Sequence, residues 1–247
     1  MVLAVHGLGG SGRYWNKLAR RIGGHYRVVA PDLAGFGRSD KPAAAYDRGF
    51  HLANLDAIVA ERAGSGSVVV VGHSLGAVFA ALWAASHVDD VRGLGLAAAP
   101  YPSGEGPPDW ARRGPPAALR AMGGVVRAAW PFVAVPIGVA RGYPASLVMD
   151  FGRQRMDSRT RTMVSALWDP GVTAEVETIR SLSRTPALLV NARDDRTVSL
   201  EAQQRWSELL PNAELRVLDE GGHQFPLRTG FAALAEWLGG LLLETAG

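Results

Sequence analysis

A serine between two glycines, in the segment Gly72-His73-Ser74-Leu75-Gly76, is the sequence feature that most constrains this fold. The four valines before it indicate a buried strand, and the apolar segment at 77–83 indicates a helix packed on its apolar side. A serine at a sharp turn from strand to helix presents its hydroxyl at the end of a sheet. Glycine is needed where such a turn brings backbone against backbone, because a Cβ would collide there. The helix also directs its first N–H groups at the serine, where they can stabilise negative charge.

Further apolar runs are spread along the chain, and each is bounded by Gly, Pro, Asp or Asn. They predict strands at 2–5, 27–30, 67–71, 91–98, 187–191 and 213–218. Helices are predicted between them, at 13–22, 51–63, 75–86, 173–182, 200–209 and 229–243. Strands with continuous apolarity that alternate with helices are typical of a parallel sheet covered on both faces. The sequence therefore predicts an α/β fold with a mostly parallel, doubly wound sheet.

The alternation stops between residues 100 and 171, in a segment rich in Pro, Gly, Arg and aromatic residues. Helical patterns are present there at about 117–129 and 146–167. We interpret 100–171 as a helical lid, or cap, inserted after the strand at 91–98 into a core domain formed by 1–99 and 172–247. Its aromatic residues are expected mainly to pack within the lid, with one or two lining an apolar acyl pocket. They are Trp110, Trp130, Phe132, Tyr143, Phe151 and Trp168.

Composition excludes several other classes of protein. The chain of 247 residues is 47% hydrophobic, which is enough for one large core. It has no cysteine, so disulfides, zinc–thiolate sites and a cysteine nucleophile are excluded. No signal peptide is visible, and the longest apolar stretch, at about 128–140, is too short to span a bilayer. We therefore expect a cytoplasmic protein that binds no membrane. No metal-ligand spacing, cofactor motif or nucleic-acid-binding motif is recognisable, so no metal, cofactor or nucleic acid is expected.

The charge of the chain is unevenly distributed. Residues 101–165 contain nine arginines and four acids, a balance of +5, whereas the rest of the chain contains 17 basic and 19 acidic residues, a balance of −2. Solvated helix faces account for such arginines in general. The sharper interpretation is that they attract an anionic substrate or an acidic carrier.

Side chains suited to nucleophilic catalysis follow several predicted strands at the point where each ends. Ser74 follows the third strand, Asp194 and Asp195 follow the fifth, and His223 follows the last. Because the loops after parallel strands emerge at one edge of a sheet, a hydroxyl, a carboxylate and an imidazole can meet there. The imidazole can take the serine proton, and the carboxylate can fix the tautomer of the imidazole.

Five motifs follow one another along almost the whole chain: HGLGGS at 6–11, DLAGFGRSD at 32–40, GHSLG at 72–76, NARDD at 191–195 and GGH at 221–223. In order and spacing they resemble those of the α/β-hydrolase superfamily. The resemblance implies that Ser74 is the nucleophile and His223 the base of a catalytic triad. It also implies that the backbone N–H groups of Leu8 and Leu75 form the oxyanion hole.

The acid of the triad is less sharply indicated. In similar enzymes it stands three residues after a glycine at the strand end, and Ala192 occupies that glycine position here. The resemblance makes Asp195 the match and leaves Asp194 as the alternative. Glu105, after the fourth strand, is a weaker candidate because only some relatives place their acid there.

Other polar residues near these motifs are expected to have structural roles. His6 is expected to bond to nearby loop backbone, and Asp32 to tie loops together. His73 is expected to point away from Ser74. Many similar proteins carry an antiparallel strand pair before the first strand predicted here, so either the sheet has six strands or the start of the chain is truncated.

The sequence thus predicts a serine hydrolase that cleaves an ester, thioester or lactone through an acyl-enzyme on Ser74. Its substrate is expected to be a small acyl compound, either anionic or carried by an acidic carrier. A serine at this position argues against epoxide hydrolase or haloalkane dehalogenase chemistry, because those relatives use a carboxylate nucleophile. The same triad leaves open a carbon–carbon bond hydrolase, an acyltransferase, a non-hydrolytic cyclase and a small-molecule receptor. Both a monomer and a dimer are compatible with the sequence.

Overall fold

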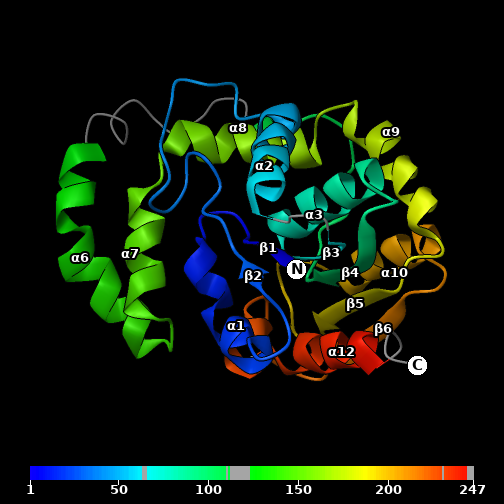
Figure 1. Cartoon of the computed structure of the whole chain (residues 1–247). Helices are drawn as coiled ribbons and strands as arrows, with labels where there is room; N and C mark the ends of the chain where they lie inside the picture. The colour runs from blue at the N-terminus through cyan, green and yellow to red at the C-terminus, as the bar shows by residue number, and fades with distance from the viewer. Residues whose placement is uncertain (63–65, 110, 112–122, 230, 244–247) are drawn as a thin grey trace.

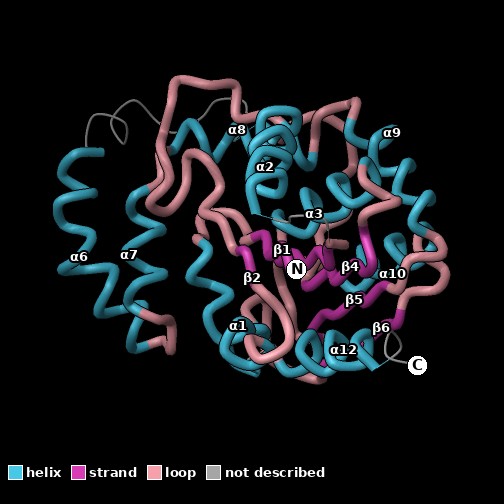
Figure 2. Tube along the Cα trace, viewed as in Figure 1, coloured by secondary structure: helices cyan, strands magenta, loops and turns pink. Residues whose placement is uncertain are grey.

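Six parallel strands form one sheet at the centre of the computed structural model (Figures 1 and 2). The structure describes residues 1–62, 66–109, 111, 123–229 and 231–243. The strand order is β2-β1-β3-β4-β5-β6, and every neighbouring pair is parallel. The predicted doubly wound α/β fold is confirmed. The strands are β1 (Val2–Val5), β2 (Val28–Val29), β3 (Val68–His73), β4 (Val91–Ala97), β5 (Ala187–Ala192) and β6 (Glu214–Leu218).

The helices that connect these strands agree with the predicted ones in position. In two of the predicted helices one end is a 3₁₀ turn: η1 (Gly12–Trp15) precedes α1 (Asn16–Ile22), and η2 (Thr178–Leu182) follows α9 (Val172–Glu177). The helix predicted at 229–243 is wrong at its start, because Phe231 has a φ of 63° and separates two helices. The remaining helices outside the segment at 100–171 are α2 (Arg48–Arg62), α3 (Leu75–Ser86), α10 (Leu200–Leu209), α11 (Phe225–Thr229) and α12 (Ala232–Leu243).

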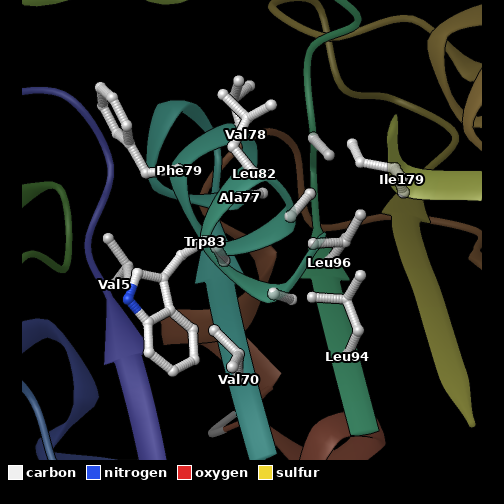
Figure 3. Close-up of a cluster of buried hydrophobic side chains, with 14 of the residues drawn as sticks. Val5, Val70, Ala77, Val78, Phe79, Leu82, Trp83, Leu94, Leu96 and Ile179 are labelled. Atoms are coloured by element: carbon white, nitrogen blue, oxygen red, sulfur yellow. The ribbon is translucent and has the colours of Figure 1, made fainter. Parts of the chain in front are cut away.

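Two hydrophobic layers cover the sheet, one on each face. Because successive side chains of a strand point to opposite faces, alternate strand residues enter alternate layers. Val70 and Leu94 face α3, where Phe79 and Trp83 are fully or almost fully buried (Figure 3). The opposite face is covered by η1, α1, α11 and α12, and Trp15 is fully buried in this layer. Burial on both faces explains why the strands read as continuous apolar runs.

The described part of the segment between β4 and α9 includes the helices α6 (Gly123–Ala140), α7 (Ala145–Arg153) and α8 (Met156–Leu167). In Figure 1, α6 and α7 stand side by side at one edge of the molecule, and α8 runs beside α2 and α3. The predicted lid and its boundaries at 100–171 stay a prediction. Trp110 and residues 117–122 of the predicted helix at 117–129 lie outside the described residues.

The helical pattern predicted at about 146–167 is present, but it divides into two helices, because Gln154 adopts an extended conformation and separates α7 from α8. Tertiary contacts account for the break. The buried Asp150 of α7 accepts a hydrogen bond from Ser11 at 2.8 Å, whereas Ser158 of α8 donates to the carbonyl oxygen of Gly35 at 3.1 Å. The two helices are therefore anchored on different loops. Within the described part of the chain, no helix is both long and apolar enough to cross a membrane.

Candidate active site

Ser74 stands between β3 and α3 in a strained backbone conformation. Its φ of 54° and ψ of −129° lie in a region that costs a non-glycine residue about 1–3 kcal/mol. The turn is held because the Ser74 N–H donates to the carbonyl oxygen of Ala97, at the end of β4, across 2.9 Å. The Ser74 side chain is half-buried at the carboxyl edge of the sheet, as the turn motif predicts.

The two glycines of the motif are required by close backbone approaches. A Cβ added to Gly72 would lie 2.5 Å from the Cα of Ala77 in α3. A Cβ added to Gly76 would collide with the carbonyl oxygens of Val5 and His6, at the end of β1. The first turn of α3 therefore packs directly on the backbone of β1 and β3, and this packing sets the position of Ser74.

His223 links Ser74 to a carboxylate, although the three residues lie far apart in the sequence. Its Nε2 is 2.9 Å from the Oγ of Ser74, and its Nδ1 is 2.9 Å from Oδ2 of Asp195. The Asp195 side chain is fully buried, whereas that of His223 is 17% exposed. The structure thus brings together the serine, histidine and aspartate that the sequence singled out, in hydrogen-bonding order. This geometry is the arrangement in which an imidazole can take a proton from a hydroxyl.

Of the candidate acids, only Asp195 is bonded to His223. Burial raises the pKa of Asp195, but the hydrogen bonds from His223 and from the N–H groups of Val198 and Thr197 outweigh it and hold this pKa below its ordinary value. Asp194 instead accepts a hydrogen bond from the N–H of Gly222 at 2.7 Å, which lowers its pKa. It ties the β5 loop to the loop of His223.

The predicted oxyanion donors lie next to Ser74. A Cβ added to Gly7 would be 3.0 Å from the Cβ of Ser74, so the loop that carries Leu8 packs against the serine. No acceptor within the described residues is bonded to the N–H of Leu8. Leu75 is the first residue of α3, and the first N–H groups of a helix have no intrahelical acceptor. The assignment of both groups to an oxyanion hole stays a prediction.

The neighbouring loops are held by the residues expected to do so. His6 is buried, and its Nε2 accepts the N–H of Leu33 at 3.0 Å. Asp32 accepts the N–H groups of Gly12 at 2.6 Å and Arg38 at 2.7 Å. Both interpretations made from the sequence are confirmed. Glu105 is exposed and has no contact with His223 within the described residues.

His73 is a residue whose role the sequence did not reveal. The side chain is buried and donates Nε2–H to the backbone carbonyl oxygen of His223 across 2.9 Å. Burial, reinforced by the proximity of His223, lowers the pKa of His73 to about 3, so the ring is neutral. Its ring stacks on that of Tyr14, with centroids 4.8 Å apart. The only sequence signal is its place between the strand and the serine, which does not indicate a partner 150 residues away.

An aromatic residue of α7 covers the loop next to Ser74. Gly9 has a φ of +76°, and a Cβ there would lie 2.5 Å from the ring of Phe151. The Phe151 ring stacks on Trp130 of α6, with centroids 5.5 Å apart and an interplanar angle of 17°. Trp130 in turn donates its ring N–H to the carbonyl oxygen of Val148 at 2.7 Å. α6 and α7 thus bring two stacked aromatic rings to the loop at Gly9.

Comparison with known proteins agrees with the fold. A model of the alpha/beta hydrolase family matches residues 2–237. Protein ABHD8 of Homo sapiens is 30% identical over 236 residues, an alignment that covers 90% of this chain and 51% of ABHD8. The chain therefore spans about half the length of the curated relatives it matches.

Solved structures show the same fold. A thioesterase domain from the curacin biosynthetic pathway has a TM-score of 0.71 and 23% identity, covering 95% of this chain and 89% of that domain. The enol-lactonase from Burkholderia xenovorans LB400 has a TM-score of 0.72 and 18% identity, covering 98% and 90%. At these identities the likeness establishes the fold alone. Since the family model matches nearly the whole chain, this protein belongs to the α/β-hydrolase family.

Proposed function

We propose that this protein is a serine hydrolase that cleaves an ester, thioester or lactone of a small acyl compound through an acyl-enzyme on Ser74. The observation that carries the proposal is the continuous relay from Asp195 through His223 to Ser74, with 2.9 Å at each step. A buried carboxylate on one ring nitrogen leaves the other nitrogen as the acceptor for the serine proton.

In the first half of the reaction, Ser74 Oγ attacks the acyl carbon while its proton passes to His223 Nε2. The carbonyl oxygen becomes an oxyanion, which the N–H groups of Leu8 and Leu75 stabilise. The bond to the leaving oxygen or sulfur then breaks, and His223 gives its proton to the leaving group. Asp195 orients the imidazole and stabilises the imidazolium that forms.

In the second half, a water molecule attacks the acyl-enzyme while its proton passes to His223. The bond between the acyl carbon and Ser74 Oγ breaks, and Ser74 recovers the proton. The products are the free acid and the alcohol or thiol, and the protein returns to its starting state. For a lactone, both product groups belong to one molecule.

Two further observations support the proposal. The strain at Ser74 holds its hydroxyl at the edge of the sheet toward His223, which prepares the geometry before substrate binds. The structural neighbours named a thioesterase and an enol-lactonase have the same fold, and acyl cleavage of these kinds suits the relay seen here.

The test is covalent labelling together with turnover. A fluorophosphonate probe should label the wild-type protein at Ser74. Turnover assays with short acyl esters, thioesters and lactones should identify the bond that the protein cleaves. Ser74→Ala should abolish labelling and lower kcat by at least about 10³-fold. Ser86→Ala is the matched control, because Ser86 is exposed at the other end of α3. A wild-type protein that is neither labelled nor active on any acyl substrate would refute the proposal.

A further inference from the structure

Arg159 of α8 differs from the arginines around it. Arg153 pairs with Asp150 at 2.8 Å, Arg155 with Asp157 at 3.0 Å, and Arg161 donates to the carbonyl oxygen of Ala44 at 3.2 Å. Arg159 is half-buried, yet its guanidinium makes no hydrogen bond or ion pair with any residue that the structure describes. Its guanidinium therefore has five N–H donors and no protein acceptor among those residues.

The guanidinium of Arg159 is held by an aromatic ring beside the candidate site. It lies over the ring of Phe151, 5.2 Å from the centroid, in a cation–π contact. The same ring packs on Gly9, the residue after Leu8. One aromatic ring thus separates Arg159 from the loop that carries a proposed oxyanion donor.

Burial without a counter-charge is unfavourable for a cation. Desolvation lowers the pKa of Arg159, and no opposing contribution from an acid acts on it. A guanidinium still remains charged at neutral pH. Such a group is stabilised when a ligand brings an anion to it.

The segment that precedes Arg159 has few acids with which to neutralise this cation. Residues 110–149 contain five arginines and no Asp or Glu. The next two acids in the chain are already bonded: Asp150 to Ser11 and Arg153, and Asp157 to Arg155. Among the described residues, no acid is therefore bonded to the guanidinium of Arg159, which lies over the Phe151 ring.

We propose that Arg159 binds a carboxylate on the acyl group of the substrate, so that the preferred substrates are half-esters or half-thioesters of dicarboxylic acids. This inference rests on the proposed function for its substrate, though the anion site can be tested without turnover. The planar guanidinium can bind the carboxylate through two parallel hydrogen bonds. Phe151 and Trp130 pack against the methylene groups between the carboxylate and the acyl carbon.

The first test compares charged and neutral esters of similar length. Turnover of the monomethyl esters of glutaric, adipic and pimelic acid is measured against methyl hexanoate, by titration of the acid released at constant pH. The wild-type protein should have a higher kcat/KM for at least one half-ester. Arg159→Gln should lower that value about ten- to a hundredfold, as the loss of charge-assisted hydrogen bonds predicts. Methyl hexanoate should change by less than about threefold.

Two further variants complete this comparison. Arg159→Lys should recover only part of the preference, because an ammonium cannot form the bidentate pair. Arg161→Gln, an equal change of charge at an exposed position of the same helix, should leave both substrates unaffected. A wild-type protein without preference for any half-ester, or an equal loss on both substrates in Arg159→Gln, would overturn the proposal.

The second test separates the anion site from catalysis. Binding of adipate and hexanoate to Ser74→Ala protein is measured by titration calorimetry, with and without Arg159→Gln. Adipate should bind at least about tenfold more tightly than hexanoate, and only when Arg159 is present. Binding of this kind by a protein that turns over no ester would refute the proposed hydrolase and support the anion site. Equal binding of the two ligands would overturn the anion site alone.

Discussion

His73 and His223 are joined by a hydrogen bond of 2.9 Å from the Nε2–H of His73 to the backbone carbonyl oxygen of His223. The residue before the proposed nucleophile thus positions the backbone of the proposed base. His73 is buried beneath Tyr14, and its neutral ring can only donate through Nε2 in this contact. The bond connects the end of β3 to the loop after β6, and therefore sets the distance between Ser74 and His223.

Removal of this bond should impair turnover more than substrate binding. His73→Phe keeps the ring volume but loses the donor, and kcat should fall about ten- to a hundredfold, as expected for a buried acceptor left unpaired. KM should change little, because the His73 side chain is buried and is not proposed to contact the substrate. His73→Gln, which retains an N–H donor, should recover part of kcat. Equal effects of the two variants on kcat would show that His73 contributes only packing.

Substitutions at the neighbouring residues Asp194 and Asp195 should have very different effects on kcat. Asp195→Asn removes the carboxylate that holds His223 Nδ1 and should lower kcat by about 10⁴-fold, since the imidazole then favours the wrong tautomer. Asp194→Asn keeps an oxygen that can accept the N–H of Gly222 and should change kcat by less than about threefold. Steady-state kinetics on a short acyl ester measures both. The reverse order would assign the acid to Asp194.

Buried neutral histidines should make stability depend on pH. Burial lowers the pKa of His51 to about 4 and that of His73 to about 3, from 6.5. Between pH 6.5 and 4 the unfolded chain binds protons at these residues and the folded protein does not. The free energy of unfolding should therefore fall as pH falls through this window, by about 1.4 kcal/mol per pH unit for each histidine.

Urea unfolding between pH 4.5 and 7 measures this slope. His51→Gln should reduce it by about 1.4 kcal/mol per pH unit, because one titrating group is lost. His25→Gln, at an exposed position, is the control and should leave the slope unchanged. A slope that is unaffected by His51→Gln would mean that His51 is not held neutral by the fold.

The glycine after Leu75 should tolerate no side chain. Gly76→Ala places a Cβ against the carbonyl oxygens at the end of β1 and should lower the free energy of unfolding by about 2–3 kcal/mol. Gly239→Ala, in α12, meets nothing within 4 Å and should raise it by about 0.5–1 kcal/mol. Urea unfolding compares the two. A Gly76→Ala protein as stable as the wild type would contradict the close packing of α3 on β1.

Local pattern was sufficient for most elements of the core. The bounds of β1, α3 and α10 agree with those predicted, because an apolar run and its flanking residues determine each of them locally. The break at Gln154 could not be predicted, since the sequence through 146–167 is compatible with one helix. Its cause is the anchoring of Asp150 on Ser11 and of Ser158 on Gly35, more than 120 residues away in each case.

The sequence by itself determined the parallel α/β fold and the candidates Ser74, His223 and the aspartate pair at 194–195, because strand ends and turn residues are local signals. Only the tertiary structure decided which carboxylate is bonded to His223, which backbone group His73 binds and where Arg159 lies. Each of these depends on distances between segments that no local pattern encodes. A hydrogen bond or a cation–π contact forms only within a few ångströms, and the folding of the whole chain sets that separation.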